Sequence, residues 1–314
     1  MAWKKHLTQE EKSAYHEKKQ SEMSKLFQRI DEGVKEVFTS EKYQEYLRFM
    51  AKFTNYSARN CMLIAMQKPD ATLVAAYGKW KQLGRQVSKG ETGIRILAPM
   101  PYKRKQNEQL EEEESEEIER IAFKAVSVFD VSQTSGAELP SFLDELHGEI
   151  PAEQKKAILT ALQKAVGISI AFEDIQGTAK GYYSASENRI VIRTGMSDAQ
   201  TLKTVFHECV HKLLHDPELQ TQTVHASRSE KEIQAESVAF IVAERFGLDT
   251  SEYSFPYIAS WSQGKTLETL HKVLTEIQSA AKILTNAVET GLQALQEEQA
   301  EIEEKSPVFC DISM

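Results

Sequence analysis

Cysteine is scarce in this 314-residue sequence, and long apolar runs are missing from it. Cys61, Cys209 and Cys310 are far apart, odd in number and form no Cys-x-x-Cys pair. This pattern argues against a disulfide framework, so a reducing cytoplasm is the expected location. No apolar run approaches the length that spans a bilayer, and no signal peptide is recognisable, so no membrane partner is expected.

Charge is distributed unevenly along the chain. Residues 1–105 contain 21 Lys and Arg against 11 Asp and Glu, a net charge of +10. The remainder contains 17 against 36, a net charge of -19, which accounts for the overall value of -9. A basic first third on an acidic chain indicates that this part meets a polyanion such as nucleic acid, although a solvated helical surface has the same composition.

The segment His207-Glu208-Cys209-Val210-His211 has the form His-Glu-x-x-His inside an amphipathic run. On a helix, His207 and His211 share one face, so both imidazoles can bind one metal ion. Glu208 projects nearby and can take a proton from a metal-bound water. Zinc with three protein ligands and one open position is the usual arrangement of a hydrolytic zinc site. The motif therefore predicts a metallopeptidase-like centre with one zinc ion per chain.

The third metal ligand is expected on a second helix downstream, where Glu232 and Glu236 are four residues apart. The metzincin pattern does not apply, because Pro217 occupies the position of its third histidine. In glutamate zincins the third ligand is a glutamate on such a helix, and a second acid four residues later orients a ligand histidine. We assign Glu232 as the ligand and Glu236 as the orienting acid, and the reverse assignment stays open.

Other polar side chains near the motif have weaker signals. His215 follows His211 by four residues and is expected to interact with the negative end of the helix dipole. Tyr182 and His225 are candidates for a donor that stabilises the oxyanion of the reaction, and the sequence does not choose between them.

Hydrophobic periodicity changes along the chain and predicts an α+β protein. Helical segments and a β-hairpin come first, a zincin-like arrangement of strands and helices follows, and a long amphipathic helix comes last. The predicted limits are 1–131 for the N-terminal domain with a solvated acidic insertion at 103–120, 132–150 for an irregular linker, 151–262 for the metallopeptidase domain, and 263–314 for the C-terminal helix and tail.

Two blocks of the sequence resemble a known family. The first is Asn55–Asn60 followed by Trp80–Gly93, where Trp-x-x-Leu-Gly-x-x-Val-x-Lys-Gly-Glu-x-Gly is the more specific pattern. It resembles the N-terminal single-stranded-DNA-binding domain of the ArdC-like and LtrC-like antirestriction proteins. The second is His207–His215 with Glu232–Phe240. It is similar to the metallopeptidase domain of the same family and, more distantly, to that of the ImmA and IrrE proteins.

The resemblance implies a cytoplasmic protein of a plasmid, conjugative element or phage that binds single-stranded DNA and shields entering DNA from host restriction. It also implies a zinc-type site, but it names no protein or peptide substrate. Binding of single strands needs basic groups for phosphates and aromatic faces for bases. The residues in these blocks that match this need, or allow a tight turn near a phosphate, are Tyr56, Arg59, Asn60, Trp80, Lys81, Arg85, Lys89 and Gly90. For Trp80, a place in the hydrophobic core is an equally open alternative.

Two competing functions stay open from the sequence. One is a shield that coats single-stranded DNA and cleaves nothing, with a structural or vestigial metal. The other is a peptidase that cleaves a repressor and whose basic domain binds protein. Glu208 favours an enzyme, because a purely structural metal site has no need of a base. The sequence predicts no particular oligomeric state.

Overall fold

The structure, a computed structural model, describes residues 8–102, 120–139, 146, 150–218 and 226–305, and the predicted acidic insertion lies outside these residues except for Arg120. The chain forms two compact units. We call them the N-terminal unit (Met1–Glu36 with Arg59–Leu139) and the C-terminal unit (Val37–Ala58 with Pro140–Met314). Both helices and strands are present, as the predicted α+β class requires.

The two units are not contiguous in sequence, in contrast to the domain limits predicted above. Residues 37–58 belong to the C-terminal unit because helix α2 (Ser40–Lys52) packs on α7 (Arg228–Arg245). The buried Tyr43 hydroxyl lies 2.7 Å from the Ser237 hydroxyl across this contact. Periodicity identifies α2 as amphipathic, but it does not say which core receives its apolar face.

The N-terminal unit combines α-helices with antiparallel strand pairs. Its elements are α1 (Gln9–Val37), α3 (Ala58–Gln67), β1 (Val74–Ala76), α4 (Tyr77–Gln82), β2 (Arg85–Val87), β3 (Ile94–Tyr102), β4 (Arg120–Asp130), the 3-10 turn η1 (Val131–Gln133) and β5 (Thr134–Gly136). One sheet has the order β1-β4-β3, and β2 pairs with β5. The predicted pair of long strands is therefore present as β3 and β4.

Side-chain amides from α3 cover the outer edge of β3. Asn60 accepts from the Leu97 N–H and donates to the Leu97 carbonyl, both at 2.9 Å. Gln67 makes the same pair of bonds with Arg95, again both at 2.9 Å. An amide side chain carries one acceptor and two donors, so it can replace one residue of a neighbouring strand. These two bonds protect an edge that would otherwise invite pairing with another chain.

The predicted linker begins with ordered structure. Residues 132–150 were expected to be irregular, but Thr134–Gly136 form β5 and pair with β2 in antiparallel register. Gly136 has φ of 137°, and a Cβ there would lie 2.4 Å from the Gly84 carbonyl oxygen. Only glycine permits this close approach, so the residue that looked like a linker signal is required by the strand pair.

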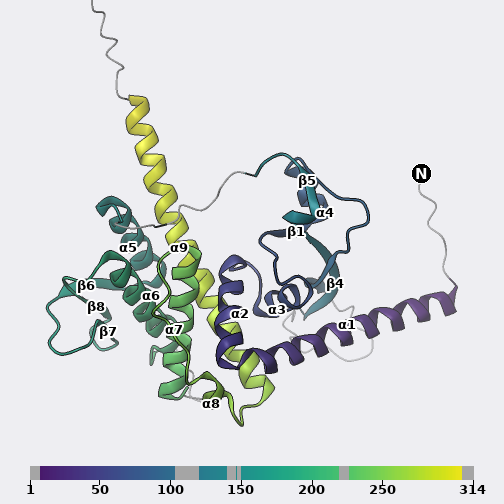
Figure 1. The fold of residues 1–314 in the computed structure, drawn as a ribbon, viewed down its shortest axis with the longest axis horizontal. Helices are drawn as coiled ribbons and strands as arrows, with labels where there is room; N and C mark the ends of the chain where they lie inside the picture. Colours follow the sequence, from purple (N-terminus) through teal and green to yellow (C-terminus); the bar gives the residue numbers. More distant parts are fainter. Residues whose placement is uncertain (1–7, 103–119, 140–145, 147–149, 219–225, 306–314) are drawn as a thin grey trace, which may run out of the picture. The chain divides into compact units, whose positions relative to one another are not determined.

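The C-terminal unit places helices against a three-stranded mixed sheet (Figure 1). Besides α2 and α7 it contains α5 (Ala152–Val166), β6 (Ser169–Glu173), β7 (Gly181–Ser184), β8 (Arg189–Arg193), α6 (Asp198–His215), α8 (Ile258–Ser262) and α9 (Leu267–Lys305). The strand order is β6-β8-β7, with β6 parallel and β7 antiparallel to β8. Strands β7 and β8 form an antiparallel hairpin, and it leads directly into α6.

Helix α9 packs along α5 and α7. Its contact with α5 is close at Gly291, where a Cβ would lie 2.9 Å from the Ala157 carbonyl oxygen and 3.0 Å from the Ala161 Cβ. None of the helices in the described ranges combines the length and apolar character that crossing a bilayer demands.

Candidate metal centre

Helices α6 and α7 bring two histidines and one carboxylate together. The His207 and His211 Nε2 atoms are 3.1 Å apart on one face of α6. The Glu232 carboxylate on α7 reaches both, with Oε2 3.5 Å from His207 Nε2 and Oε1 3.9 Å from His211 Nε2. All three ligand atoms lie within 4.8 Å of one another.

Both helices are fixed by local sequence and by packing. Ser197 caps α6 and Ser227 caps α7, each accepting a bond from the backbone N–H three residues on. Such caps satisfy N–H groups that the helix itself leaves free. Helices α6 and α7 pack on each other, and Phe206 on α6 and Phe240 on α7 are fully buried. The positions of His207 and Glu232 follow from this contact.

The donor set fits a small transition-metal ion. Zinc binds histidine nitrogen at about 2.0–2.1 Å with tetrahedral angles, which places two ligand nitrogens roughly 3.3 Å apart. The observed separation of the His207 and His211 nitrogens is 3.1 Å. The Glu232 oxygens stand at a comparable separation from both. Two imidazoles and one carboxylate would leave one coordination position for a water or substrate atom.

The short distances between His207, His211 and Glu232 shift the pKa values of all three side chains. Although burial works against the charged form of His207, its hydrogen bond with Glu232 and the neighbouring carboxylates raise its pKa. Burial and the nearby His207 charge lower the pKa of His211 to about 4. The hydrogen bond with His207 holds the pKa of Glu232 below its ordinary value. His211 is thus neutral at physiological pH, the form that binds a metal.

Glu208 is the buried carboxylate of the motif, and only 7% of it is exposed. Burial raises its pKa above the ordinary glutamate value. The backbone of Tyr183 on β7 donates a hydrogen bond to it. Glu208 therefore stands beside the three-residue cluster without joining it, as a proton acceptor would.

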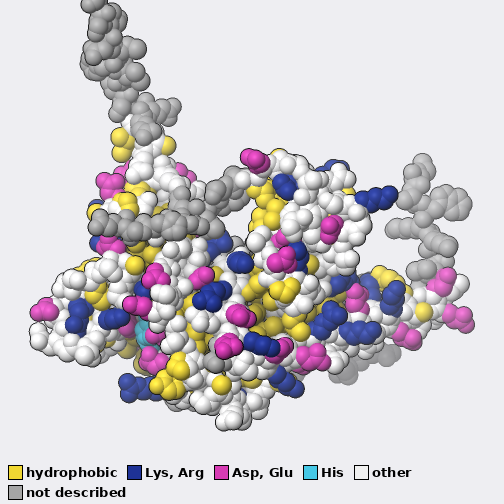
Figure 2. All heavy atoms as spheres, viewed as in Figure 1, with side chains coloured by type: hydrophobic (Ala, Val, Ile, Leu, Met, Phe, Trp, Pro, Cys, Tyr) yellow, Lys and Arg dark blue, Asp and Glu magenta, His cyan; other side chains and the backbone are white. Residues whose placement is uncertain are grey.

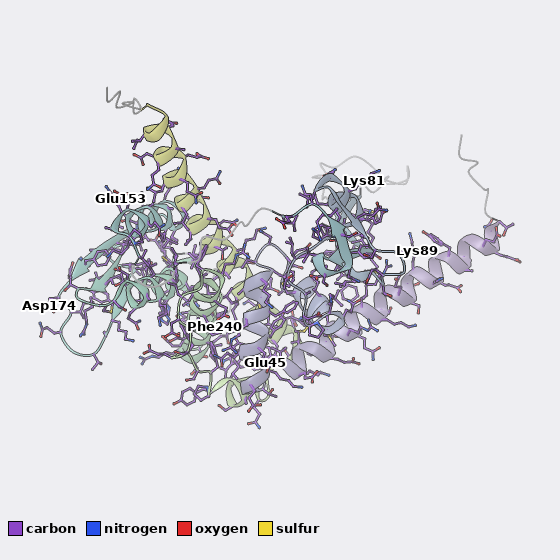
Figure 3. All side chains as sticks on the ribbon, turned by 45° about the horizontal axis from the view of Figure 1, so that its top comes forward. Glu45, Lys81, Lys89, Glu153, Asp174 and Phe240 are labelled. Carbon is purple, nitrogen blue, oxygen red and sulfur yellow. The ribbon has the colours of Figure 1, made fainter. Side chains whose placement is uncertain are left out.

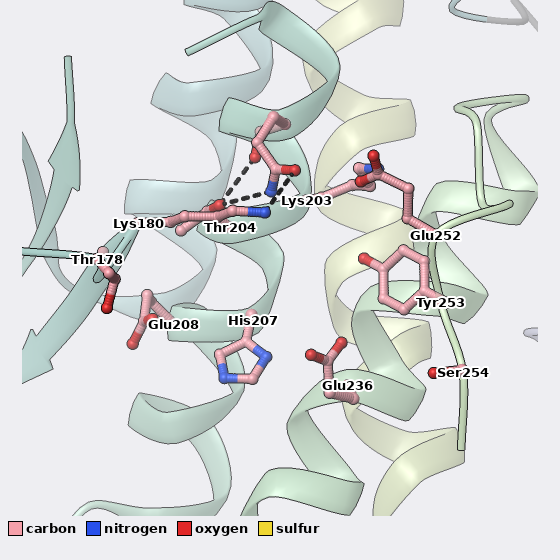
Figure 4. Close-up of a pocket in the computed structure, with 12 residues that line it drawn as sticks. Thr178, Lys180, Lys203, Thr204, His207, Glu208, Glu236, Glu252, Tyr253 and Ser254 are labelled. Atoms are coloured by element: carbon pink, nitrogen blue, oxygen red, sulfur yellow. Dashed lines mark hydrogen bonds and ion pairs between the residues drawn. The ribbon is translucent and has the colours of Figure 1, made fainter. Parts of the chain in front are cut away.

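A cavity of about 410 Å³ opens beside His207 and Glu208 (Figure 4). Charged groups of both signs line it, Lys180, Lys203, Glu236 and Glu252, and Lys203 Nζ lies 3.8 Å from Glu252 Oε2. Lys203 is almost fully buried, and its ammonium donates to the Asp249 carbonyl at 3.1 Å. The cavity has the size of an ordinary small-ligand site, so it can receive one or two residues of a peptide.

Glu236 occupies a different position from Glu232. It lines the cavity and points toward His207 in Figure 4, and it does not join the cluster of His207, His211 and Glu232. The assignment of Glu232 as the ligand and Glu236 as the acid that orients a ligand histidine stays a prediction.

His215 is the last residue of α6, and its interaction with the helix dipole stays a prediction. It is buried, with Nδ1 3.0 Å from His211 Nδ1 and Nε2 2.8 Å from Gln234 Oε1. Packing of α7 over the last turn of α6 removes His215 from water. Of the two candidate oxyanion donors, Tyr182 is 40% exposed, and His225 lies outside the described residues.

Several residues predicted to bind DNA are structural instead. Trp80 is fully buried and donates to the Phe129 carbonyl at 2.9 Å, so no face of its indole is open to a base, and its predicted stacking role is wrong. Asn60 is engaged with Leu97 on the β3 edge. The Arg85 guanidinium bonds the Thr134 hydroxyl, the Thr134 carbonyl and the Ala137 carbonyl, which holds β5 against β2.

The other predicted DNA-binding residues divide between the two units. Tyr56 lies in the C-terminal unit, half-buried, with its ring edge-on to Phe53 at 6.0 Å between centroids. Arg59, Lys81 and Lys89 are exposed on the N-terminal unit, where Figure 3 labels the two lysines. Gly90 is also exposed, with φ of 94° in the turn that follows Lys89.

Two family models match separate parts of the chain. Residues 13–129 match the N-terminal domain of anti-restriction factor ArdC, and residues 163–278 match the IrrE N-terminal-like domain of peptidase family M78. The chain thus contains a region that matches the ArdC N-terminal domain and a second region that matches the M78-type domain. The second match contains the whole cluster of His207, His211 and Glu232.

Individual relatives are distant. An uncharacterised Bacillus anthracis protein is 27% identical over 303 residues, which cover 85% of this chain. The chain spans about half the length of this curated relative, 51%. The metal-free crystal structure of the antirestriction ArdC protein from plasmid R388 is 22% identical, with a TM-score of 0.48. The match covers 76% of this chain and 86% of the ArdC chain. The Mn(II)-bound structure of that protein is 21% identical, with a TM-score of 0.47. The match covers 75% of this chain and 87% of the ArdC chain.

In the ArdC-type region, Tyr77 is 52% exposed and has the open ring that Trp80 lacks. Sequence reasoning missed one residue of the M78-type region. There, Gln234 Oε1 lies 2.8 Å from Nε2 of His215, whose Nδ1 lies 3.0 Å from Nδ1 of His211. The i, i+4, i+8 spacing of His207, His211 and His215 is the one sequence signal for this, because it places all three on one face of α6.

Proposed function

We propose that the C-terminal unit is a zinc-dependent peptidase site and that the N-terminal unit binds single-stranded DNA. One observation carries the peptidase assignment. His207, His211 and Glu232 converge within 4.8 Å beside Glu208, a buried carboxylate that lines a cavity. A structural metal site needs closed coordination and no base. Here three ligands leave a position open, and a base stands next to it.

The residues of the chain divide the work of peptide hydrolysis. A bound zinc ion would polarise the scissile carbonyl and make a water molecule more acidic. Glu208 accepts the proton of the attacking water and returns it to the leaving amine. The Tyr183 backbone bond keeps the Glu208 carboxylate in place. Strand β7 is the edge of the sheet β6-β8-β7, so an extended peptide can lie along it.

Metal removal tests this assignment. We expect the purified full chain to contain about one zinc ion and to cleave labelled casein, and to lose cleavage after treatment with a chelator. Zinc should restore cleavage, and manganese is tested beside it because histidine and carboxylate ligands accept both ions. A chain that takes up neither ion on dialysis would exclude the peptidase.

DNA binding is proposed for the exposed basic side chains of the N-terminal unit. Lys79 and Lys81 lie on α4 next to the exposed Tyr77, and Lys89 lies in the turn after β2. Cations and an open aromatic ring are the groups that hold phosphates and bases of a single strand. On the face drawn in Figure 2, basic and acidic side chains lie interspersed, so individual lysines must be tested.

Replacing Lys81 and Lys89 together by Ala is expected to weaken binding of an oligo-dT strand and to flatten its salt dependence. Each lost phosphate contact lowers the slope of log K against log salt by about 0.7 for single strands, so the pair should lower it by about 1.4. Fluorescence anisotropy between 50 and 200 mM salt measures this, a range in which the effect is large.

The matched control for this experiment is the replacement of Lys156 and Lys164 by Ala. Both are exposed lysines on α5 of the C-terminal unit, and the same charge is removed. An equal effect of the two pairs would show that only net charge matters, which would contradict a DNA site on the N-terminal unit.

Together the two activities make an antirestriction-type protein that acts in the cytoplasm on entering DNA. The family description of the first match supports this role. The alternative, a shield that cleaves nothing, has the same DNA-binding unit. A variant of Glu208 distinguishes the two functions, because only the peptidase needs a base.

A further inference from the structure

A chain of hydrogen bonds leads from His211 to helix α9. His211 Nδ1 is 3.0 Å from His215 Nδ1, and His215 Nε2 is 2.8 Å from Gln234 Oε1. Gln234 Nε2 donates to Glu276 Oε2 at 2.7 Å. These hydrogen bonds connect three helices, with the histidines on α6, the glutamine on α7 and the glutamate on α9. It lies on the side of the His211 ring opposite to His207 and Glu232.

The direction of the bonds can be followed from the carboxylate. The Gln234 amide nitrogen is only a donor, so Glu276 accepts. The Gln234 oxygen is only an acceptor, so His215 carries its proton on Nε2. A neutral His215 then has a lone pair on Nδ1, and His211 must donate from its own Nδ1. The remaining nitrogen of His211, Nε2, is therefore unprotonated, and it is the atom that faces His207 and Glu232.

The opposite direction is incompatible with a metal at this site. It would need a protonated Glu276 that donates to Gln234, and a His215 that donates from Nδ1. His211 would then hold its proton on Nε2 and have no lone pair for a metal. Burial raises the pKa of Glu276, whereas Lys272 Nζ, 3.8 Å from Glu276 Oε1, and the bond from Gln234 favour the ionised carboxylate. His215 is 6% exposed and Gln234 is 2% exposed, so water does not offer substitute partners.

We propose that His215, Gln234 and Glu276 are positioning residues that hold His211 in the tautomer with Nε2 free for the metal. The inference rests on the metal centre proposed above, and it adds the residues that preorganise one ligand before the metal arrives. Groups that orient a ligand histidine in this way typically change metal affinity by about 10- to 100-fold when removed.

Zinc affinity of three variants tests the proposal, measured on the full chain by competition with a chromophoric chelator. His215→Phe removes both nitrogens, and Gln234→Met removes both amide groups at similar volume. Each is expected to weaken zinc binding by about 10- to 100-fold. Glu276→Gln tests the origin of the direction, because an amide at this position can donate to Gln234 as well as accept from it, so zinc binding should weaken, though less than in the other two variants. Wild-type affinity in Gln234→Met, with an unchanged melting temperature, would overturn the proposal.

The tautomer itself is observable without metal. Long-range 1H–15N spectra of the metal-free wild type should show His211 protonated on Nδ1 and His215 on Nε2. His211 protonated on Nε2 would overturn the proposal even if the variants did not fold. A wild type that shows the expected tautomers but takes up no zinc would reject the proposed metal centre and retain the hydrogen-bond chain, so the two failures are distinguishable.

Discussion

A Glu208→Gln variant is expected to lose about 100- to 10,000-fold in peptide hydrolysis, the usual contribution of a general base. Glutamine has the shape of glutamate, and its amide can still receive the backbone bond from Tyr183, but it cannot take a proton from water. The cluster of His207, His211 and Glu232 does not include residue 208. Metal content should therefore equal that of wild type.

Casein cleavage, zinc content and oligo-dT binding of Glu208→Gln are measured on the same sample. Loss of cleavage with zinc and DNA binding retained identifies Glu208 as the base. Protection of DNA from restriction is then the decisive comparison. Undiminished protection by the variant would favour the shield that cleaves nothing, whereas cleavage that persists within about threefold of wild type would contradict the role of Glu208.

Glu232→Ala should abolish zinc binding in the micromolar range, whereas Glu236→Ala should bind zinc with affinity lowered by at most about 10- to 100-fold. The reason is geometric. The Glu232 oxygens lie 3.5 and 3.9 Å from the two histidine nitrogens, and Glu236 lines the cavity outside this cluster. A metal ion loses a direct ligand in the first variant and only a neighbouring charge in the second.

The two variants control for each other, because each removes one exposed carboxylate from α7 and leaves the helix intact. Zinc titration with a competing chelator compares them directly. If Glu236→Ala lost zinc and Glu232→Ala kept it, the reverse assignment, which the sequence leaves open, would be correct. Equal losses would mean that both carboxylates bind the metal.

The amino-acid sequence determined the local features of this protein. The spacing of His207 and His211 and the amphipathic periodicity were sufficient for α6 and for the second helix with Glu232, α7, since helix signals come from residues close in sequence. The resemblance of the block around Trp80 to the ArdC N-terminal domain was also recognisable from the sequence, because the pattern is long and specific. Residue type alone, however, does not separate a tryptophan that stacks on a base from one that fills a core.

The tertiary structure decided every question that depends on segments far apart in sequence. It buried Trp80, engaged Asn60 with β3 and Arg85 with β5, and so removed them from the candidate DNA surface. It attached α2 to the C-terminal unit and brought Glu232 beside the two histidines. It also joined His215 to Glu276 through Gln234. The physical reason is the same throughout: a polar side chain takes its role from the partner that packing places beside it, and the sequence does not state that partner.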